Sequence, residues 1–189
     1  MVNLSLYAIQ GVLILDNEGK RVFTKYFHPP HEPVSDGWSF STVKKQKEFE
    51  AKLFKKTYKK NAEILILEDR LVLYKECANV ILYVMGSLEE NEIVLQDTLN
   101  AIKVGIEVEL NTDIDKKAIQ DNYDVVCLVV DEVIDDGIIL ETELRTINSR
   151  VTKAPTNEPT ITIDLSEKGL LSAWGFAKSK LAETLQQGL

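Results

Sequence analysis

Residues 62–86, AEILILEDRLVLYKECANVILYVMG, decide the fold class of this chain. Three runs rich in β-forming residues, 62–68, 70–75 and 79–86, are separated by short polar stretches around Asp69 and Glu76. Connections this short suit antiparallel neighbours, because parallel strands need a crossover of about a dozen residues or more. The stretch therefore predicts a three-stranded antiparallel meander.

A second β-rich region opens the chain. Residues 4–15 and 21–27 have the composition of strands, and DNEGK at 16–20 is a Gly-containing turn between them. The region predicts a hairpin. The next residues, 28–38, contain three prolines and are expected to form a loop. No further ligands accompany His28 and His31 in that loop, so we expect no metal site there.

Between the hairpin and the meander lies a lysine-rich stretch, STVKKQKEFEAKLFKKTYKK at 41–60. Its apolar residues recur at helical spacing and form one narrow stripe, so we expect a helix that packs on the sheet by one edge. The stripe consists of Val43, Phe49, Leu53, Phe54 and Tyr58. Eight lysines against two glutamates give the stretch a net charge of +6, which leaves −14 on the rest of a chain whose net charge is −8.

Helices are expected to follow the meander. SLEE at 87–90 matches a capping box, with Ser87 and Glu90 three residues apart, and predicts a helix start. Apolar residues then recur at steps of three and four as far as Leu110, and residues 113–122 begin another helical piece.

The stretch NYDVVCLVVDEVIDDGIILETE, residues 122–143, allows three interpretations. Asp131 and Glu132 after an apolar run resemble the acidic pair of a P-loop NTPase, but the chain has no G-x-x-x-x-G-K-[ST] loop. A calcium loop counted from Glu132 would place Ile134, which has no oxygen ligand, at its third position. The third interpretation, a helix that ends at Gly137 as its C-cap, fits the apolar spacing.

The helix interpretation leaves one feature unexplained. Asp135 and Asp136 would lie beside the negative end of the helix, at a cost of about 0.3–1 kcal/mol. Helix physics gives no reason for them, which favours a positively charged partner at this point.

We expect a domain at 1–150, a linker at 151–168 and an amphipathic C-terminal helix at 169–189. The linker contains Pro155 and Pro159, and the helix is indicated by the spacing of Leu170, Trp174, Ala177, Leu181 and Leu185. Because that helix carries few basic residues, we expect it to pack on the domain or on a partner. Binding in a membrane interface is the alternative.

Composition and missing motifs exclude several classes of protein. A net charge of −8 argues against nucleic acid as a partner, and the apolar runs are shorter than the roughly 20 residues that span a bilayer. Cys77 and Cys127 have no C-x-x-C spacing and are expected to be buried, reduced thiols in a cytosolic protein. Without a G-x-S-x-G or G-x-G-x-x-G motif, a His-anchored triad or paired Cys ligands, we expect neither an enzyme nor a bound cofactor.

The order of the expected elements resembles the longin fold of the small subunits of vesicle coats. VLILDNEGKRVFTKYF (12–27), NVILYVMGSLEENEIVLQDTLNAI (79–102) and CLVVDEVIDDGIILETE (127–143) are similar to segments of the coatomer zeta family. The resemblance implies an α+β fold with a five-stranded antiparallel sheet, in the order β-β-α-β-β-β-α-α, and helices on both faces.

The resemblance also implies a function. It implies a structural small subunit of the coatomer coat, paired with a helical-solenoid subunit of the gamma type and with other coat subunits, in transport from the Golgi to the endoplasmic reticulum. Such a subunit would reach Golgi membranes and coated vesicles peripherally, from the cytosolic side. The related sigma subunits bind acidic dileucine signals partly through a basic residue at the first hairpin turn. Here residues 16–19 contain no basic residue, so dileucine binding is not carried over.

Two alternatives stay open. The first is a longin regulatory domain that docks a SNARE helix or a small GTPase. The second is a small-molecule enzyme with Mg²⁺ at Asp131 and Glu132.

Two groups of residues are the candidate contact sites. Those expected at a partner interface are Tyr74, Tyr83, Leu95, Leu99, Asp131, Glu132 and Ile138. The lysines Lys52, Lys55, Lys56 and Lys59 form either a solvated helix face or a contact with anionic lipid or an acidic partner loop.

Overall fold

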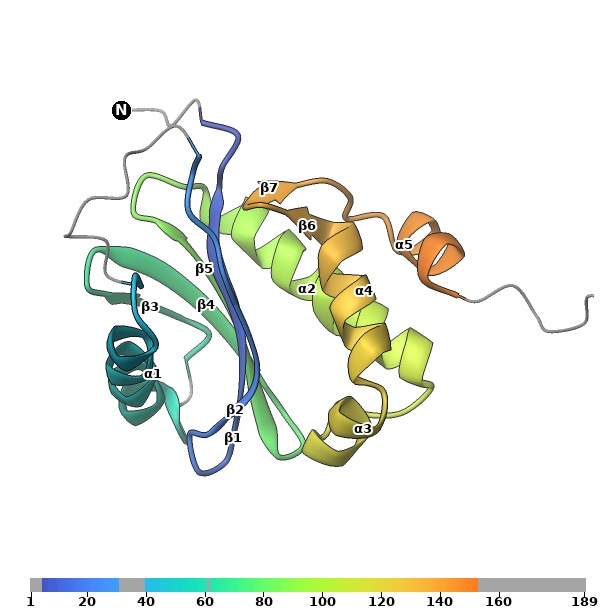
Figure 1. Cartoon of the computed structure of the whole chain (residues 1–189), viewed down its shortest axis with the longest axis horizontal. Coiled ribbons are helices and arrows are strands. Elements are labelled where there is room, and N and C mark those ends of the chain that lie inside the picture. Colours follow the sequence, from blue (N-terminus) through green and yellow to red (C-terminus); the bar gives the residue numbers. More distant parts are fainter. Residues whose placement is uncertain (1–4, 31–39, 61, 153–189) are drawn as a thin grey trace, which may run out of the picture. The chain divides into compact units, whose positions relative to one another are not determined.

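A computed structural model describes residues 5–30, 40–60 and 62–152 of the chain (Figure 1). The elements in order are β1 (Ile9–Asp16), β2 (Arg21–Tyr26), α1 (Val43–Thr57), β3 (Ile64–Leu67), β4 (Arg70–Cys77), β5 (Val80–Ser87), α2 (Glu92–Leu110), α3 (Lys116–Asp121), α4 (Tyr123–Val133), β6 (Ile134–Asp135), β7 (Ile138–Ile139) and α5 (Leu144–Val151). The predicted linker and C-terminal helix lie outside the described residues, apart from Val151 and Thr152 at the end of α5.

Five of these strands form one antiparallel sheet, which confirms the predicted sheet and meander. Its strand order is β2-β1-β5-β4-β3, so β2 and β3 are its edges. Figure 1 shows α1 on one face and α2, α4 and α5 on the other. The prediction of helices on both faces is therefore also confirmed.

The alternation of side chains along the strands builds a separate core on each face. On β4, Leu71 and Leu73 join the larger cluster beneath α2 and α4, whereas Val72 and Tyr74 join the cluster beneath α1. The central strands β1 and β5 are buried along almost their whole length. The edge strand β3 is not, because α2 packs over β4 and β5.

A bulge changes the direction of side chains on β2. Ile14 pairs with Phe23 and Leu15 pairs with Arg21, which leaves Val22 without a partner on β1. Phe23 and Val22 pack with the cluster beneath α4, whereas Arg21 reaches α1. Bulges commonly redirect a side chain in this way.

The start predicted for α2 at Ser87 is wrong. Ser87 is the last residue of β5, and its Oγ accepts a hydrogen bond from the backbone N–H of Glu89 at 3.2 Å, within a turn. The N-cap is Asn91, whose Oδ1 accepts from the N–H of Ile93 at 2.9 Å. Asn is as good a cap as Ser, so the capping-box pattern did not distinguish the two positions.

The end predicted for α4 at Gly137 is also wrong. The helix ends at Val133, and Asp136 and Gly137 form the turn of a small hairpin between β6 and β7. Both turn residues have positive φ, 46° and 89°. An Asp-Gly pair is typical of such turns. This removes the apparent misplacement of Asp135 and Asp136, since they belong to a hairpin rather than to a helix end.

Other boundaries differ in smaller ways. β1 begins at Ile9 rather than at residue 4, and β4 continues to Cys77 because its turn to β5 is shorter than predicted. The hairpin β6–β7 and the helix α5 were not predicted. Among the described residues, no helix has the length and apolarity needed to cross a membrane.

Candidate functional surfaces

Four of the seven predicted interface residues lie in the interior. Tyr74, Tyr83, Leu95 and Leu99 are at most 2% exposed. The Tyr74 and Tyr83 rings have centroids 5.8 Å apart, and the Tyr83 hydroxyl lies 2.7 Å from Thr57 Oγ1 on α1. Burial raises the pKa of Tyr83. As contact residues they stay predictions, but their burial indicates that they support the surface from below instead of facing a partner.

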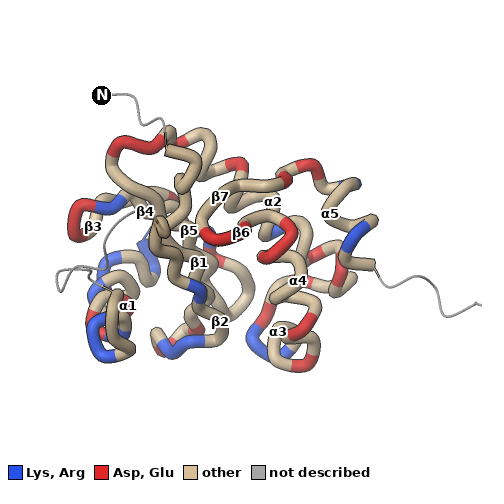
Figure 2. The backbone as a smooth tube through the Cα atoms, turned by 45° about the horizontal axis from the view of Figure 1, so that its top comes forward, with Lys and Arg blue, Asp and Glu red and all other residues tan. Residues whose placement is uncertain are grey.

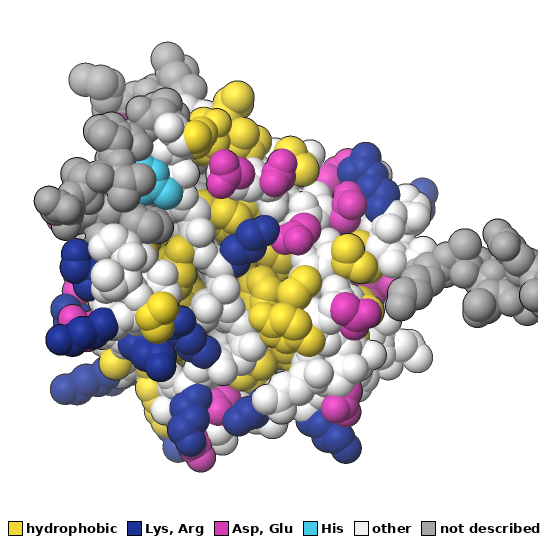
Figure 3. Space-filling model, in the orientation of Figure 1, with side chains coloured by type: hydrophobic (Ala, Val, Ile, Leu, Met, Phe, Trp, Pro, Cys, Tyr) yellow, Lys and Arg dark blue, Asp and Glu magenta, His cyan; other side chains and the backbone are white. Residues whose placement is uncertain are grey.

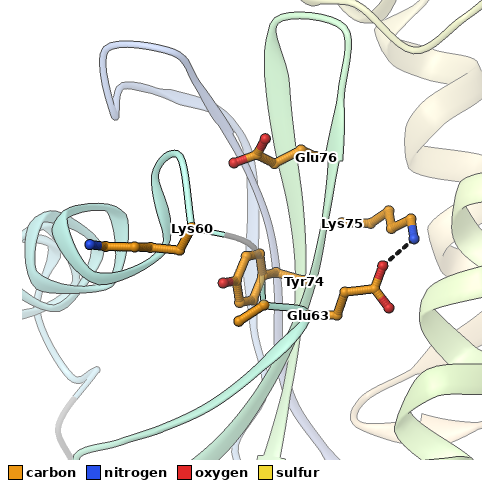
Figure 4. Close-up of a pocket in the computed structure, with 6 residues that line it drawn as sticks. Lys60, Glu63, Tyr74, Lys75 and Glu76 are labelled. Atoms are coloured by element: carbon orange, nitrogen blue, oxygen red, sulfur yellow. Dashed lines mark hydrogen bonds and ion pairs between the residues drawn. The ribbon is translucent and has the colours of Figure 1, made fainter.

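A hollow of about 410 Å³ lies beside Tyr74, at the end of α1. In Figure 4 the Tyr74 hydroxyl points toward the side where Lys60 lies. Glu63 and Lys75 form an ion pair on the other side of Tyr74. Lys60, Glu76 and Ala62 complete the lining. Among the described residues that line the hollow, no nucleophile is arranged beside a base.

The acidic pair that resembled an ion site is engaged in ion pairs within the chain. Asp131 Oδ1 accepts a hydrogen bond from Lys25 Nζ at 2.7 Å, and Glu132 Oε2 accepts one from Arg150 Nη1 at 3.2 Å. Ile138, the third predicted contact on this side, is half-buried on β7. Within the described ranges, no group of three or more His, Cys, Asp or Glu residues is placed to hold a metal ion.

The edge strand β3 exposes two apolar side chains. Leu65 and Leu67 pack beneath α1, so Ile64 and Ile66 point to the opposite face, where they are 45% and 61% exposed. The pairs Glu63–Lys75 and Lys52–Glu68 flank the strand. An exposed apolar edge strand with unpaired backbone groups is unfavourable in a monomer and favourable in an interface. Sequence reasoning missed these residues, because ILIL does not reveal which strand lies at the edge.

The lysines of α1 form a basic face, which also carries the exposed Glu48. All six lysines of the helix, and Lys59 and Lys60 after it, are exposed, while Phe49, Glu50, Leu53 and Thr57 are buried against the sheet. Figure 2 shows the basic residues along α1 and at the β1–β2 turn, and Figure 3 shows their side chains gathered at the lower left.

The four predicted lysines differ in their surroundings. Lys52 pairs with Glu68 at 2.6 Å, and Lys59 Nζ lies 5.1 Å from the centroid of the Tyr58 ring. Lys55 and Lys56 are exposed in the last turn of α1, where cations suit the negative end of the helix. The structure thus separates two lysines with neighbours in the chain from two that project into solvent.

Beneath the basic face lies a charged cluster that the sequence did not predict. Glu50 is 3% exposed, and its carboxylate accepts hydrogen bonds of 2.6 Å from both Arg21 Nε and the Tyr26 hydroxyl. Burial and the neighbouring Glu50 both raise the pKa of Tyr26. Gln46 receives a further bond from Arg21 at 3.1 Å. The cluster fixes α1 to β2.

A second buried carboxylate holds the first hairpin turn. Asp16 is 1% exposed, and its Oδ1 accepts hydrogen bonds from the N–H groups of Glu18 and Lys20 at 2.9 and 2.8 Å. Its Oδ2 accepts one from Lys116 Nζ on α3 at 2.8 Å. Burial opposes ionisation of Asp16, but these hydrogen bonds outweigh it and lower its pKa. Asp16 therefore stabilises the turn and connects it to α3 through Lys116.

Comparisons with known proteins agree with this geometry. Residues 8–158 match the family model "Clathrin adaptor complex small chain". A chain of the full-length AP-3 complex, from a homology model in a stretched open conformation, superposes with a TM-score of 0.56 at 17% identity, and covers 91% of this chain and 98% of its own length. That likeness supports the fold alone.

Two relatives are closer in sequence. The coatomer subunit zeta of Saccharomyces cerevisiae is 56% identical over 191 aligned residues, covering the whole of both chains. The human coatomer subunit zeta-1 is 37% identical over 147 residues, which is 78% of each chain. The chain therefore belongs to the coatomer zeta family, the small subunits of a vesicle coat within the clathrin adaptor small chains.

Proposed function

We propose that this chain is a structural subunit of the coatomer coat that pairs stably with a larger helical-solenoid subunit of the gamma type. In this role it serves retrograde transport from the Golgi to the endoplasmic reticulum, on the cytosolic face of Golgi membranes and coated vesicles. Its part is structural, not catalytic. The observation that carries the proposal is the open β3 edge, where Ile64 and Ile66 are exposed in a chain of a coat-subunit family.

Burial of the β3 edge explains how a stable complex can form. Fully burying an isoleucine side chain contributes roughly 1.5–3 kcal/mol. Among the described residues only β4 pairs with β3, so the outer backbone groups of β3 can add polar contacts with a partner. Around this centre the ion pairs Glu63–Lys75 and Lys52–Glu68 provide a charged rim with no net charge, which matches the usual anatomy of an interface.

The remaining predicted contacts lie elsewhere. Asp131, Glu132 and Ile138 belong to α4 and β7, and Asp131 is paired with Lys25 on β2, the opposite edge of the sheet from β3. We propose these three as contacts with another coat subunit.

The test is coexpression of the full chain with the larger coat subunit. We expect a 1:1 complex, and poor solubility of the chain without its partner. The double variant Ile64→Lys/Ile66→Lys should weaken the complex roughly a hundredfold or more, because two apolar contacts are replaced by charges. It should also improve the solubility of the isolated chain.

The matched control is Val108→Lys/Leu128→Lys, on helices α2 and α4, where the side chains are 49% and 44% exposed. This control should leave the complex intact. Equal loss of binding in both variants, or a well-behaved monomer that ignores the partner, would contradict the proposed surface. A chain that instead binds a SNARE helix or a small GTPase through β3 would favour the regulatory alternative.

A further inference from the structure

We infer that the lysine face of α1 is an electrostatic contact for an anionic lipid bilayer, which orients the subunit with α1 toward the membrane. The inference rests on the proposed function only in placing the chain at a membrane. It assigns a role to the lysine face of α1, which, apart from Lys52, takes part neither in the proposed interface at β3 nor in the buried ion pair that holds the helix.

The first argument is the distribution of charge around α1. The helix buries Phe49 and Leu53 and turns its six lysines away from the sheet. Lys44, Lys47, Lys55 and Lys56 are exposed and form no ion pair within the part of the chain that the structure describes. Lysines that the fold does not neutralise keep their full attraction for an external anion.

The second argument is the distribution of charge across the whole domain. Residues 118–144 contain eight Asp and Glu and no Lys or Arg. They run from the end of α3 through α4, β6 and β7 to the start of α5, and α4 lies on the other face of the sheet from α1. Figure 2 shows basic residues along α1 and acidic residues at α4 and the β6–β7 hairpin, with further basic residues on α3 and α5. A chain with a net charge of −8 is repelled by an anionic bilayer in most orientations. The favourable orientation has α1 facing the bilayer and the acidic residues of α4 and the β6–β7 hairpin facing away.

The third argument is the type of cation. All eight basic residues between 41 and 60 are lysines, with no arginine among them. Protein interfaces are enriched in Arg and depleted in Lys, since Arg forms directed bidentate contacts. A set of flexible point charges suits a fluid layer of phosphate-bearing headgroups better than the fixed carboxylates of a protein.

The basic face is built for contact without insertion. Phe49 and Leu53, the large apolar side chains at the centre of α1, are buried in the domain and cannot enter a bilayer. Val43, in the first turn of α1, is exposed. Attraction therefore comes mainly from charge and falls steeply with salt, because the Debye length shrinks from about 10 Å at 0.1 M to about 3 Å at 1 M.

The experiment measures cosedimentation of the full chain, alone or with its larger subunit, on vesicles of phosphatidylcholine with and without phosphatidylserine. We expect binding that requires phosphatidylserine and declines with added salt. Lys55→Glu/Lys56→Glu should reduce the bound fraction about tenfold or more, given a contribution of roughly fivefold per lysine near an anionic surface. Lys55→Arg/Lys56→Arg keeps the charge and should retain binding.

The matched control is Lys117→Glu/Arg145→Glu, which makes the same change in net charge on exposed residues of α3 and α5. It should reduce binding far less. Equal loss of vesicle binding in both charge reversals, or binding that does not depend on phosphatidylserine, overturns the inference. It is also overturned if the Lys55→Glu/Lys56→Glu variant still binds vesicles but no longer binds an acidic protein partner.

Membrane contact and subunit pairing can fail independently. The Lys55→Glu/Lys56→Glu variant should still copurify with the larger subunit, whereas Ile64→Lys/Ile66→Lys should still bind vesicles. Loss of copurification in the lysine variant would place α1 in the subunit interface and contradict the inference, while leaving the coat assignment intact.

Discussion

Two ion pairs start from the same strand, β2, and differ in what surrounds them. Arg21 pairs with Glu50 beneath α1, where the carboxylate side chain is 3% exposed. Lys25 pairs with Asp131 on α4, where the side chains are 38% and 54% exposed. In the first pair the Glu50 carboxylate is shielded from water and also bonded to Tyr26, while the Arg21 side chain is 24% exposed; the second pair is largely solvated. The Arg21–Glu50 ion pair therefore fixes α1 to the sheet, whereas the Lys25–Asp131 ion pair lies on the surface and is exposed to solvent.

This difference separates charges that the fold uses from charges that it leaves available. On the α1 side, the interior carboxylate Glu50 is satisfied by Arg21 and Tyr26, and the exposed lysines take no part in holding the helix. On the α4 side, the acids that first suggested an ion site have their partners in the chain. The lysines of α1 that form no ion pair within the described part of the chain are therefore the candidates for membrane contact.

The largest effect is expected from Glu50→Ala. Removing the buried member of this pair leaves Arg21 Nε and the Tyr26 hydroxyl without their acceptor, although Arg21 Nη2 keeps its bond to Gln46, so we expect a loss of about 3–5 kcal/mol in the free energy of unfolding. Urea denaturation of the chain in complex, or of a soluble variant, measures this loss. Glu50→Gln keeps the shape and one acceptor and should lose less. A change below about 1 kcal/mol for Glu50→Ala would show that the two pairs on β2 are equivalent after all.

A smaller, pH-dependent effect is expected from Asp16→Asn. Because the folded pKa of Asp16 lies below its ordinary value of 3.8, the unfolded chain binds more protons there, and the carboxylate stabilises the fold above that value. This contribution is lost as the pH falls through the folded pKa. Asp16→Asn should therefore cost about 1–3 kcal/mol at neutral pH and progressively less in acid.

Unfolding curves at neutral and acid pH distinguish this role. Convergence of the Asp16→Asn variant with the unmodified chain in acid supports a buried, hydrogen-bonded carboxylate. A constant difference at every pH would instead assign the effect to packing of the turn.

The smallest effect is expected from Asp131→Asn. The pair with Lys25 is exposed, so its loss should change the free energy of unfolding by less than about 1 kcal/mol. Any larger consequence should appear in the binding of further coat subunits, measured by copurification. A stability loss as large as that of Glu50→Ala would erase the contrast between the two pairs.

The sheet could be predicted because its strands carry strong β-forming runs joined by short turns, and the first hairpin and meander follow from residues 12–27 and 62–86. The end of α4 could not be placed from Gly137 alone, since a helix C-cap and a hairpin turn both require positive φ. Asp136 before it was the signal for a hairpin. The helix α5 was missed because it is short and carries few apolar residues, Leu144, Ile147 and Val151.

The candidate surfaces were harder to predict than the fold. Tyr74 and Tyr83 were expected at a partner interface, but strands within a two-sided core bury such residues. The burial of Glu50 could not be predicted, because Glu50 lies in a lysine-rich helix. Its partner Arg21 reaches it because of a β-bulge, and no sequence pattern indicated that bulge. Ile64 and Ile66 are exposed only because β3 lies at an edge, which depends on strand order.

Hydrogen exchange at the β3 backbone, compared between the free chain and its 1:1 complex with the larger coat subunit, tests the central claim most directly. We predict that the amides of residues 64–67 exchange markedly more slowly in the complex, while those of β2 at the other edge change little. Unchanged exchange at β3 in a complex that has formed would contradict the account, because the partner would then bind another surface.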